Sequence, residues 1–579
     1  GYENEWNIET NWSTGAVPGT GSEVFIPDGA PQLLIDDAVS CDYLTVESAD
    51  NPGYTNLVVL NGGTLTVSEV MTIASDASVT VDEGGVIESG LVEINTSGST
   101  SGSLVNKGVV NGIVVYNRHL LPKAYGGDFQ LVASPVLSNS DPNTEDILRA
   151  KSWNEVTGTW FNGLMVDVVN GKGYNLKQTE TGDGTVTFSG PLPADNTIEI
   201  EATCPFIGAY DGTLTGYNAR SYVSNTSSNS GTPRDGGDYW GGGGWNLLGN
   251  PFASAMSVAG FIDYNFGTSW ETSQFDPSYV ALYIHEGATT SYKYVANSTG
   301  WEGGDYLNQP NIPAGQGFFV LAMDDLSTFT FTRDMQVHDT EVPMLKSTKT
   351  DDRWPGLQLK VKYGDTEKST VIVYGENMTA GLDPGFDIGQ YANYSEIAIY
   401  TALAAEDNGV NFDRQALPIA DCTKNTVPVG IDSENGGEVT FSAITIPIGS
   451  YKFWLEDRVA GIYTDLTTKS YSVTLPEKSY GTGRFYVLVS ANTPTGIERP
   501  ENEDTGLRIW RSNSRIIIKG EVSERAVCQI YDMKGQRISE TRLADGEMNT
   551  VTLPSGTNGI YLVRVIDGVK ITTRKVAVL

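Results

Sequence analysis

The sequence predicts an all-β protein that is built from several domains in succession. Long helical periodicity is almost absent, short runs of alternating apolar and polar residues dominate, and Gly, Asn, Asp and Pro clusters separate these runs. At 579 residues the chain is too long for one hydrophobic core, because domains usually span about 100–200 residues. We therefore expect about three to five β domains.

Residues 1–116 are predicted to form a parallel β-helix-like solenoid with an N-terminal cap. Strand-like runs such as LVVL (57–60), TLTV (64–67), MTI (71–73) and SVTV (78–81) start about seven residues apart, and Gly-containing turns separate them. Three such faces give a coil of about twenty residues that buries its apolar side chains by stacking on the next coil. An ordinary sandwich of short strands is the alternative. The opening segment NWSTGAVPGTGSEVFIPDG is expected to be a cap, or the joint to a preceding region.

Residues 117–344 are predicted to form an aromatic-rich β-sandwich of the jelly-roll kind. Runs such as GDFQLVASPV, YVALYIHEG and IPAGQGFFVLA have the pattern of buried strands with Gly and Pro at the corners. The segment 216–244, rich in Ser, Gly and Asn, is expected to be a long surface loop. The run WGGGGWNLLGNP looks like a phosphate-binding loop, but the Lys-Ser/Thr pair of such loops is missing. We therefore expect a turn before a buried strand at Trp245.

A second β-sandwich is predicted for residues 345–492, because runs such as GLQLKVKYG, STVIVYG, GEVTFSAI and RFYVLVS alternate there with turn clusters. Residues 493–506 are polar and acidic and contain proline, so they are expected to be a linker. Each cysteine falls in a different predicted domain, which argues against disulfides within a domain and against a zinc cluster. The four are Cys41, Cys204, Cys422 and Cys528.

The net charge changes sign near the end of the chain. The formal charge of the whole chain is −34, which argues against nucleic-acid binding, since phosphate contacts need Lys and Arg. Residues 507–579 contain 12 Lys+Arg and 7 Asp+Glu, a net charge of +5, so the preceding residues carry −39. This final module is expected to have a different partner from the body. The chain has no run of 18 apolar residues, so no transmembrane segment is expected. Because it begins without Met, we expect a removed signal or a longer parent protein.

The final module has the strand pattern of a minimal Ig-like sandwich. AVCQIYDMKGQRISETRL is predicted to be a hairpin with Gly535 at a positive φ in its turn, and TLPSGTNGIYLVRV adds an apolar strand after a Pro/Gly corner. These motifs, followed by KVAVL, resemble the type A C-terminal sorting domain of the Bacteroidota type IX secretion system. The residues that carry the resemblance are Tyr531, Asp532, Gly535, Arg537, Leu553, Pro554, Gly556, Tyr561, Val563, Arg564, Lys575 and Val576.

The resemblance implies that the protein passes through the periplasm and crosses the outer membrane by the type IX translocon. The outer-membrane shuttle barrel of that system would recognise the tail. In many relatives a sortase then removes the tail and attaches the body to surface lipopolysaccharide or releases it. The stretches GWNLLGNPF and IPAGQGFFV are similar to the C-terminal regions of large Bacteroidota surface proteins. We therefore expect the protein at the cell surface or outside the cell.

Few residues point to chemistry. The three histidines, at 119, 285 and 338, lie far apart, and no metalloprotease or nucleophile-elbow motif occurs, so we expect no enzymatic activity. Asp407, Asn411 and Asp413 have the oxygen ligands that calcium prefers, but they match no calcium-loop pattern. Turn formation is their favoured role, and calcium is the alternative. No other cofactor is expected.

These observations predict a non-enzymatic protein that acts as an adhesin, a stalk or a matrix component. Its solenoid would form a platform, and its ligand would be a glycan or another surface molecule. The alternative is the ancillary, carbohydrate-binding C-terminal part of a larger secreted hydrolase. Exposed aromatics around 153–161 or 239–245 would then stack on sugar rings, although core packing is their favoured role.

Overall fold

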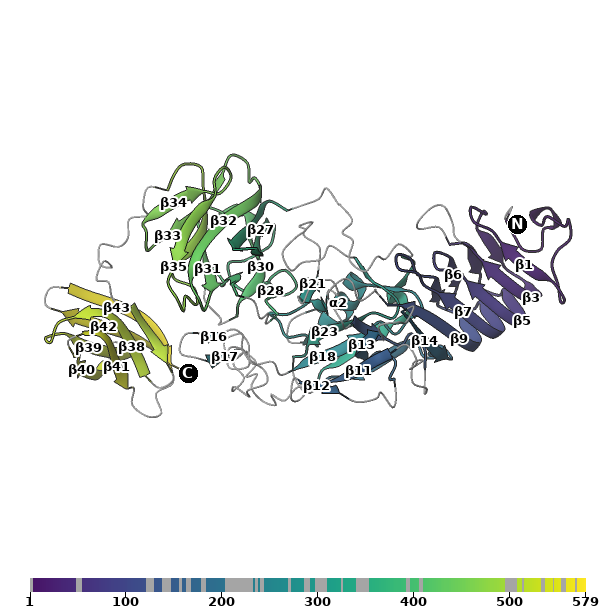
Figure 1. Ribbon diagram of the computed structural model, residues 1–579, viewed down its shortest axis with the longest axis horizontal. Helices are drawn as coiled ribbons and strands as arrows, with labels where there is room; N and C mark the ends of the chain where they lie inside the picture. Colours follow the sequence, from purple (N-terminus) through teal and green to yellow (C-terminus); the bar gives the residue numbers. More distant parts are fainter. Residues whose placement is uncertain are drawn as a thin grey trace. The chain divides into compact units, whose positions relative to one another are not determined.

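The structure is a computed structural model, and it divides into two compact units, residues 1–492 and 493–579 (Figure 1). Both units are built mainly from β-strands, which confirms the predicted all-β class. The residues that the structure describes are 4–47, 55–120, 130–137, 147–155, 159–162, 168–178, 184–203, 233–234, 238–239, 244–268, 272–285, 292–296, 310–323, 326–339, 354–391, 396–405, 410–494, 508–512, 515–532, 537–544, 546–552, 559–567 and 570–578.

The predicted solenoid is confirmed, and it consists of two parallel sheets (Figure 1). Thr64 pairs with Val86 and Val86 pairs with Val109, so one coil takes about 22 residues and neighbouring coils stay in register. One sheet contains β1 (Glu23–Ile26), β3 (Ala38–Val46), β5 (Thr64–Ile73), β7 (Val86–Asn95) and β9 (Val109–His119), and β14 (Thr185–Gly190) adds to it antiparallel. The other contains β2 (Leu33–Ile35), β4 (Leu57–Val59), β6 (Ser78–Val81) and β8 (Ser103–Asn106).

The long strands of the first sheet bend in the middle. The predicted separate strands 64–67 and 71–73 are a single strand, β5, whose pairing register shifts after Val67. The bends therefore let one sheet supply two faces of each coil. The strand pattern in the sequence is the same for one bent strand as for two short strands. At the corresponding bend of β9, Gly112 has φ +130°, and a Cβ atom there would overlap the carbonyl oxygen of Ser89. Only glycine fits this position.

A single apolar core runs along the inside of the solenoid. Leu65, Val67, Met71 and Ile73 of β5 are all fully buried, as the alternation of the strand requires. The core continues into the region that follows the solenoid, where Val132, Tyr174 and Phe188 join it.

The end of the solenoid at β8 is closed by the region that follows. The Leu104 N–H donates to the carbonyl of Ala253 at 2.8 Å. The side chain of Gln336 accepts from the Asn106 N–H at 3.0 Å and donates to the Asn106 carbonyl at 2.9 Å. These bonds satisfy the outer edge of the last coil in place of a further strand.

Residues 130–339 form several small sheets around two further cores. One sheet has the strand order β10-β13-β11-β12, and another has the order β18-β23-β20-β21. The bounds of these strands are β10 (Gln130–Ala133), β11 (Ile147–Asn154), β12 (Thr159–Asn162), β13 (Gly173–Gln178), β18 (Trp245–Gly249), β20 (Leu282–His285), β21 (Tyr292–Val295) and β23 (Gly317–Leu321). The shorter pairings involve β15 (Thr197–Glu201) with β24 (Thr328–Thr332), β16 (Pro233–Arg234) with β17 (Asp238–Tyr239), and β19 (Ala255–Ser257) with β22 (Asn311–Ile312) and β25 (Gln336–Val337).

The region also contains a helix, α2 (Val258–Phe266), that the sequence pattern did not predict. Ser257 caps its first turn by accepting from the Gly260 N–H at 3.1 Å, and Gly267 ends it at φ +74°. The helix buries Phe261 and Ile262 in the core beside β24. At nine residues it is too short to produce a clear helical period in the sequence.

Residues 354–490 form one mixed sheet with the order β34-β33-β36-β31-β29-β30-β27-β26-β32-β35, and β28 pairs with β30. Its apolar side chains share a core with the preceding region, because Ile388 and Phe412 pack with Trp245, Tyr279 and Phe319. The strands are β26 (Gly356–Tyr363), β27 (Thr366–Gly375), β28 (Ile388–Gly389), β29 (Ala398–Thr401), β30 (Phe412–Pro418), β31 (Thr426–Asp432), β32 (Gly437–Ile446), β33 (Lys452–Asp457), β34 (Ile462–Asp465), β35 (Tyr471–Leu475) and β36 (Phe485–Ser490).

The second unit contains two antiparallel sheets with a common core. The predicted hairpin is confirmed in its strands, since β39 pairs with β40. Ile516, Cys528 and Val563 lie in the core between the sheets. One sheet contains β37 (Arg508–Ser512), β38 (Arg515–Val522) and β41 (Gly546–Thr552), and the other contains β39 (Val527–Asp532), β40 (Arg537–Arg542), β42 (Gly559–Asp567) and β43 (Lys570–Val578).

Candidate functional site

Several predicted sorting residues lie in one row across the sheet β40-β39-β42-β43. Tyr531 of β39 is opposite Arg537 of β40 on one side and Leu562 of β42 on the other. Lys575 of β43 is opposite Leu562 and continues the row. Because directly opposite residues of antiparallel strands share a face, these four positions belong to one face of the sheet.

Polar contacts order this face. Tyr531 Oη donates to Gln529 Oε1 at 2.7 Å, Gln529 Nε2 donates to Glu540 Oε2 at 2.9 Å, and Glu540 forms an ion pair with Arg537. Arg564 is opposite Gln529 in the sheet register. Exposed ion pairs contribute little to stability, so Arg537 beside Tyr531 suits recognition by a partner better than folding.

The other predicted sorting residues have different positions. Tyr561 and Val563 are buried and belong to the core of the module. The remaining ones are outside the described residues in whole (Gly535, Leu553, Pro554, Gly556) or in their side chains (Asp532, Lys575, Val576).

Of the three calcium candidates, Asn411 and Asp413 are described, and both contact Gln390. Asp413 is buried, and its Oδ1 accepts from Gln390 Nε2 at 2.6 Å, while the carbonyl of Asn411 accepts from the Gln390 N–H at 2.7 Å. Asp407 is outside the described residues. Within the described ranges no group of three His, Cys, Asp or Glu could hold a metal ion.

His338 connects the segment after β25 to the solenoid. Its Nε2 lies 2.8 Å from Thr80 Oγ1 and its Nδ1 lies 2.8 Å from Ser103 Oγ. Burial lowers the pKa of the imidazole from 6.5 to about 4, because the charged form loses its hydration. The neutral ring therefore has a structural role between two hydroxyls. His119 is half-buried elsewhere in the chain, and the side chain of His285 lies outside the described residues.

The aromatic residues of the middle region mostly pack in the core. Trp153 Nε1 donates to the Trp245 carbonyl at 2.7 Å, and its ring meets those of Trp160 and Phe319 edge-on at 5.0 and 5.1 Å. Phe161 does not have the expected packing role, because 65% of its surface is exposed.

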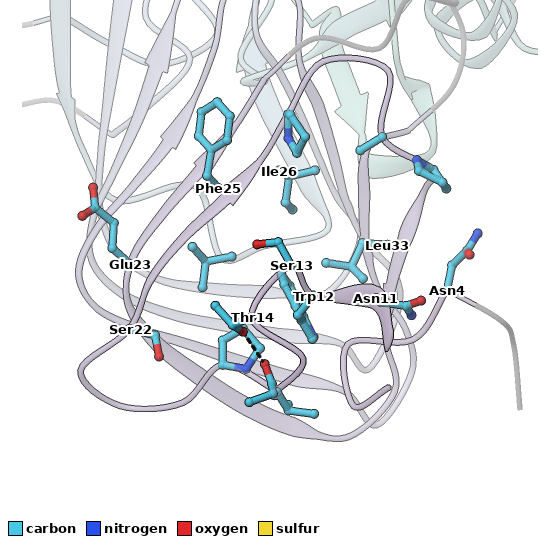
Figure 2. Close-up of a pocket in the computed structure, with 17 residues that line it drawn as sticks. Asn4, Asn11, Trp12, Ser13, Thr14, Ser22, Glu23, Phe25, Ile26 and Leu33 are labelled. Carbon is cyan, nitrogen blue, oxygen red and sulfur yellow. Dashed lines mark hydrogen bonds between the residues drawn. The ribbon is translucent and has the colours of Figure 1, made fainter. Parts of the chain in front are cut away.

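A groove that the sequence analysis did not identify lies at the start of the solenoid (Figure 2). This N-terminal groove has a volume of about 590 Å³, and it is lined by Asn4 and by residues from the segments 11–18, 22–27 and 30–33. Its lining includes Val24, Ile26 and Leu33, which also belong to the apolar core of the first coil. Figure 2 shows Trp12 and Ser13 side by side in the groove, with Ile26, Leu33 and Asn11 around them.

Residues 4–6 cover one of the two sheets at this end of the solenoid. The Trp6 N–H donates to the Leu34 carbonyl, and the Leu34 N–H donates to the Asn4 carbonyl, both at 2.9 Å, so residues 4–6 pair with β2. Trp12 Nε1 donates to the Trp6 carbonyl at 2.8 Å and holds the next loop in place. In the described part of the chain, β1 pairs with β3 alone.

The outer edge of β1 faces away from β3. The carbonyls of Ser22 and Ile26 accept from Asp42 and Glu47 of the neighbouring strand. Because backbone groups alternate in direction along a strand, those of Glu23 and Phe25 point to the opposite edge. The side chain of Phe25 is 54% exposed, and Glu23 is exposed beside it.

The solenoid strands up to β8 carry charge of one sign, and Glu23 is the charged residue among those that line the groove. Residues 1–106 contain 16 Asp and Glu and no Lys, Arg or His, a net charge of −16. Trp12 and Phe25, which line the groove, were the sequence signal for this site. The signal was missed because the segment matched a solenoid cap.

Comparisons with known proteins cover both units. A family model described as "Domain of unknown function (DUF8693)" matches residues 1–488, and a model described as "Secretion system C-terminal sorting domain" matches residues 512–579. No curated protein matches the chain. A solved structure titled "Biofilm associated protein - BSP domain" aligns at 8% identity over 80% of this chain and 95% of that one, with a TM-score of 0.14. A TM-score that low supports no shared fold. Among the described residues, no helix is long and apolar enough to span a membrane.

Proposed function

Because the chain belongs to the DUF8693 family, whose function is unknown, and ends in the sorting domain of type IX secretion cargo, we propose that its body is a non-enzymatic binding protein. The type IX system exports the protein to the cell surface or the extracellular space, and the tail interacts with that machinery. The proposed role outside is that of an adhesin, a stalk or a matrix component.

One observation carries the proposal: an acidic β-solenoid with an accessible groove is attached through a continuous core to a β-rich body. Repeat scaffolds of this kind offer extended surfaces for binding, because each coil adds to the same face. The separate core of the sorting domain supports a division of labour, in which the tail acts in export and the body acts on arrival.

The export step is tested by deleting residues 507–579. The truncated chain is expected to stay in the periplasm, since the face that contains Tyr531 and Arg537 is then absent. Immunoblots of periplasm, outer membrane and medium measure this, with the full-length protein under the same promoter as control. Normal amounts of truncated chain outside the cell would contradict the tail's role in export.

The non-enzymatic role is tested on the purified body, residues 1–492. Immobilised body is expected to retain cells or extracted matrix in a flow chamber, and a heat-unfolded sample serves as the control. The same preparation is incubated with panels of glycoside, ester and peptide substrates. Turnover of any substrate class would overturn the proposal and favour a hydrolase.

A further inference from the structure

The solenoid has an outward surface in the middle of its larger sheet. Beyond the bends, the second halves of β3, β5, β7 and β9 lie side by side (Figure 1). Buried side chains alternate there with side chains that point outward. The outward positions form an outer face with three rows: Tyr43, Val70, Leu91 and Ile113; Thr45, Thr72, Glu93 and Val115; and Asn95 with Asn117.

The first row of the outer face is apolar along its whole length. Tyr43 and Ile113, at its two ends, are 46% and 43% exposed, and Val70 and Leu91 between them are half-buried. Contiguous exposed apolar side chains mark interaction sites, because burying them against a ligand is favourable. This apolar row is therefore a candidate binding surface.

The other rows of the outer face are mainly polar, and some of their side chains order one another. Asn117 Nδ2 donates to Glu93 Oε1 at 3.2 Å and to Asn95 Oδ1 at 3.0 Å. Thr45 and Thr72 add hydroxyl groups on the neighbouring strands. Side chains that are already ordered lose little entropy when a ligand binds. The outer face therefore places an apolar strip beside fixed hydrogen-bonding groups.

The size and the repeat of the outer face select the kind of ligand. Four strands about 4.8 Å apart, with three outward positions about 7 Å apart along each, give a face about 14 Å on a side. Specific protein interfaces cover about 800 Å² on each partner, several times this area. An extended β-1,4-linked glycan fits better, because its hexoses repeat at nearly the spacing of the strands. Its ring faces are apolar and its ring edges carry hydroxyls, so each strand offers one sugar unit both kinds of contact.

Charge excludes anionic glycans and a second copy of the chain. Recognition of carboxylate, sulfate or phosphate groups relies on Arg or Lys. Residues 1–106 contain 16 Asp and Glu and no Lys, Arg or His, and Glu93 places a carboxylate on the outer face itself. A second copy would bring the same acidic coils against the first, and like charges at close range oppose association. A neutral ligand remains.

We propose that the outer face binds a neutral, extended β-1,4-linked glycan that lies across β3, β5, β7 and β9. One sugar ring stacks on Tyr43, and the following rings continue along the apolar row to Ile113. The hydroxyls at one edge of the rings bond to the polar rows. The inference deepens the proposed role outside the cell and rests on it for access of the glycan to the protein.

The probes are cellohexaose and chitohexaose, whose binding to the purified full-length chain is measured by isothermal titration calorimetry. At least one hexamer is expected to bind, and its disaccharide at least about tenfold more weakly, since a disaccharide covers only part of the row. A β-1,4-linked hexamer of glucuronic acid is expected to bind at least about tenfold more weakly than the neutral hexamer. The proposal is overturned if neither neutral hexamer binds, or if the disaccharide or the acidic hexamer binds equally well.

Substitutions at the two ends of the apolar row test whether one ligand spans it. Tyr43→Ala removes the ring at one end, and Ile113→Ser removes the apolar side chain at the other. Each is expected to lower the affinity for the hexamer at least about fivefold. The matched controls are Tyr264→Ala and Val459→Ser, at exposed positions outside the outer face, and their affinity is expected to stay the same. An unchanged affinity in either row variant would contradict a ligand along the row.

A contact between copies is the alternative that the same variants detect. Sedimentation velocity would then show a dimer of the full-length chain that Tyr43→Ala dissociates, and such a dimer without glycan binding would overturn the proposal. Urea unfolding checks the fold of each variant. Because Tyr43 and Ile113 point away from the core, the unfolding midpoints are expected to stay close to that of the wild type.

These outcomes are independent of the proposed adhesive role. Calorimetry uses purified protein and therefore does not depend on where the protein acts. If the flow-chamber assay failed while the glycan bound, the adhesive role would fall and the assignment of the outer face would stand. If adhesion occurred without glycan binding, the assignment of the outer face alone would fall.

Discussion

His338 shows how one buried side chain can link the stability of the body to pH. Its folded pKa of about 4 is below the unfolded value of 6.5, because burial disfavours the charged ring. The neutral ring is therefore favoured in the folded state. Its stabilising contribution is complete above about pH 6.5 and is lost as the pH falls towards 4. The size of this effect is about 3 kcal/mol, since one unit of pKa corresponds to about 1.4 kcal/mol.

We predict that His338→Gln reduces the loss of stability between pH 6.5 and 4. The free energy of unfolding by urea, measured across this range, is expected to change less with pH in the variant than in the wild type. His119→Gln is the control, since His119 lies elsewhere and is half-buried. An unchanged pH profile in His338→Gln would show that other groups dominate acid unfolding.

Buried carboxyls act in the opposite direction. Burial raises the pKa of Asp276 and of Asp387 well above 3.8, although backbone N–H donors partly offset this rise. Groups of this kind favour the protonated folded state, so their penalty grows as the pH rises above 3.8. The comparison of His338→Gln with the wild type cancels their contribution, because both proteins contain them.

At the scale of elements, the bends in the long solenoid strands depend on particular residues. Gly112 combines φ +130° with a close approach to the Ser89 carbonyl. We predict that Gly112→Ala lowers the free energy of unfolding by about 2–4 kcal/mol, because the methyl group forces both strain and displacement. Chemical denaturation measures the change.

A matched control for this substitution lies in the same solenoid. Gly98 is exposed, and the nearest atoms to a Cβ there are those of His119 at 3.7 Å, which is ordinary contact. Gly98→Ala is therefore expected to change stability little. Equal effects of the two substitutions would contradict the assigned role of the bend.

The elements also show where sequence prediction succeeded. Apolar runs separated by turns were enough to predict the solenoid, because the alternation of Leu65 and Val67 with exposed residues directly reflects burial. The bend after Val67 was missed, because two short strands and one bent strand have the same apolar pattern. Helix α2 was missed for a similar reason: its caps, Ser257 and Gly267, also occur at ordinary turns.

The candidate sites also include one feature that the sequence predicted and others that it did not. The motif predicted the local hairpin in which Tyr531 lies opposite Arg537, although it did not predict that pairing. The N-terminal groove forms where residues 11–18, 22–27 and 30–33 come together, and no local pattern encodes that arrangement. The core across residue 344 is also non-local, since Trp245 and Phe412 share it only after the chain has folded.

At the scale of the whole molecule, the distribution of cores predicts the unfolding behaviour. Residues 1–492 contain cores that cross the expected boundaries, whereas the sorting domain has a core of its own. We predict two unfolding transitions in calorimetry, a first one from residues 1–492 and a second one from the sorting domain. The truncated chain 1–492 is expected to show the first transition and to lack the second. Truncation at residue 344 is expected to lower the first transition, because Trp245 and Phe319 lose the cover of Ile388 and Phe412. An unchanged transition after that truncation would contradict a shared core.

The absence of basic residues from the first coils has a consequence for survival outside the cell. Proteases that cut after lysine or arginine find no such residue before Lys107. The Lys107 carbonyl, at the bond they would attack, lies 3.4 Å from an Arg333 nitrogen that donates to it. Digestion by such a protease would therefore leave strands β1, β3, β5 and β7, together with the groove along β1, in one uncut piece. The composition that makes this end acidic also shields it from a common class of degradative enzymes.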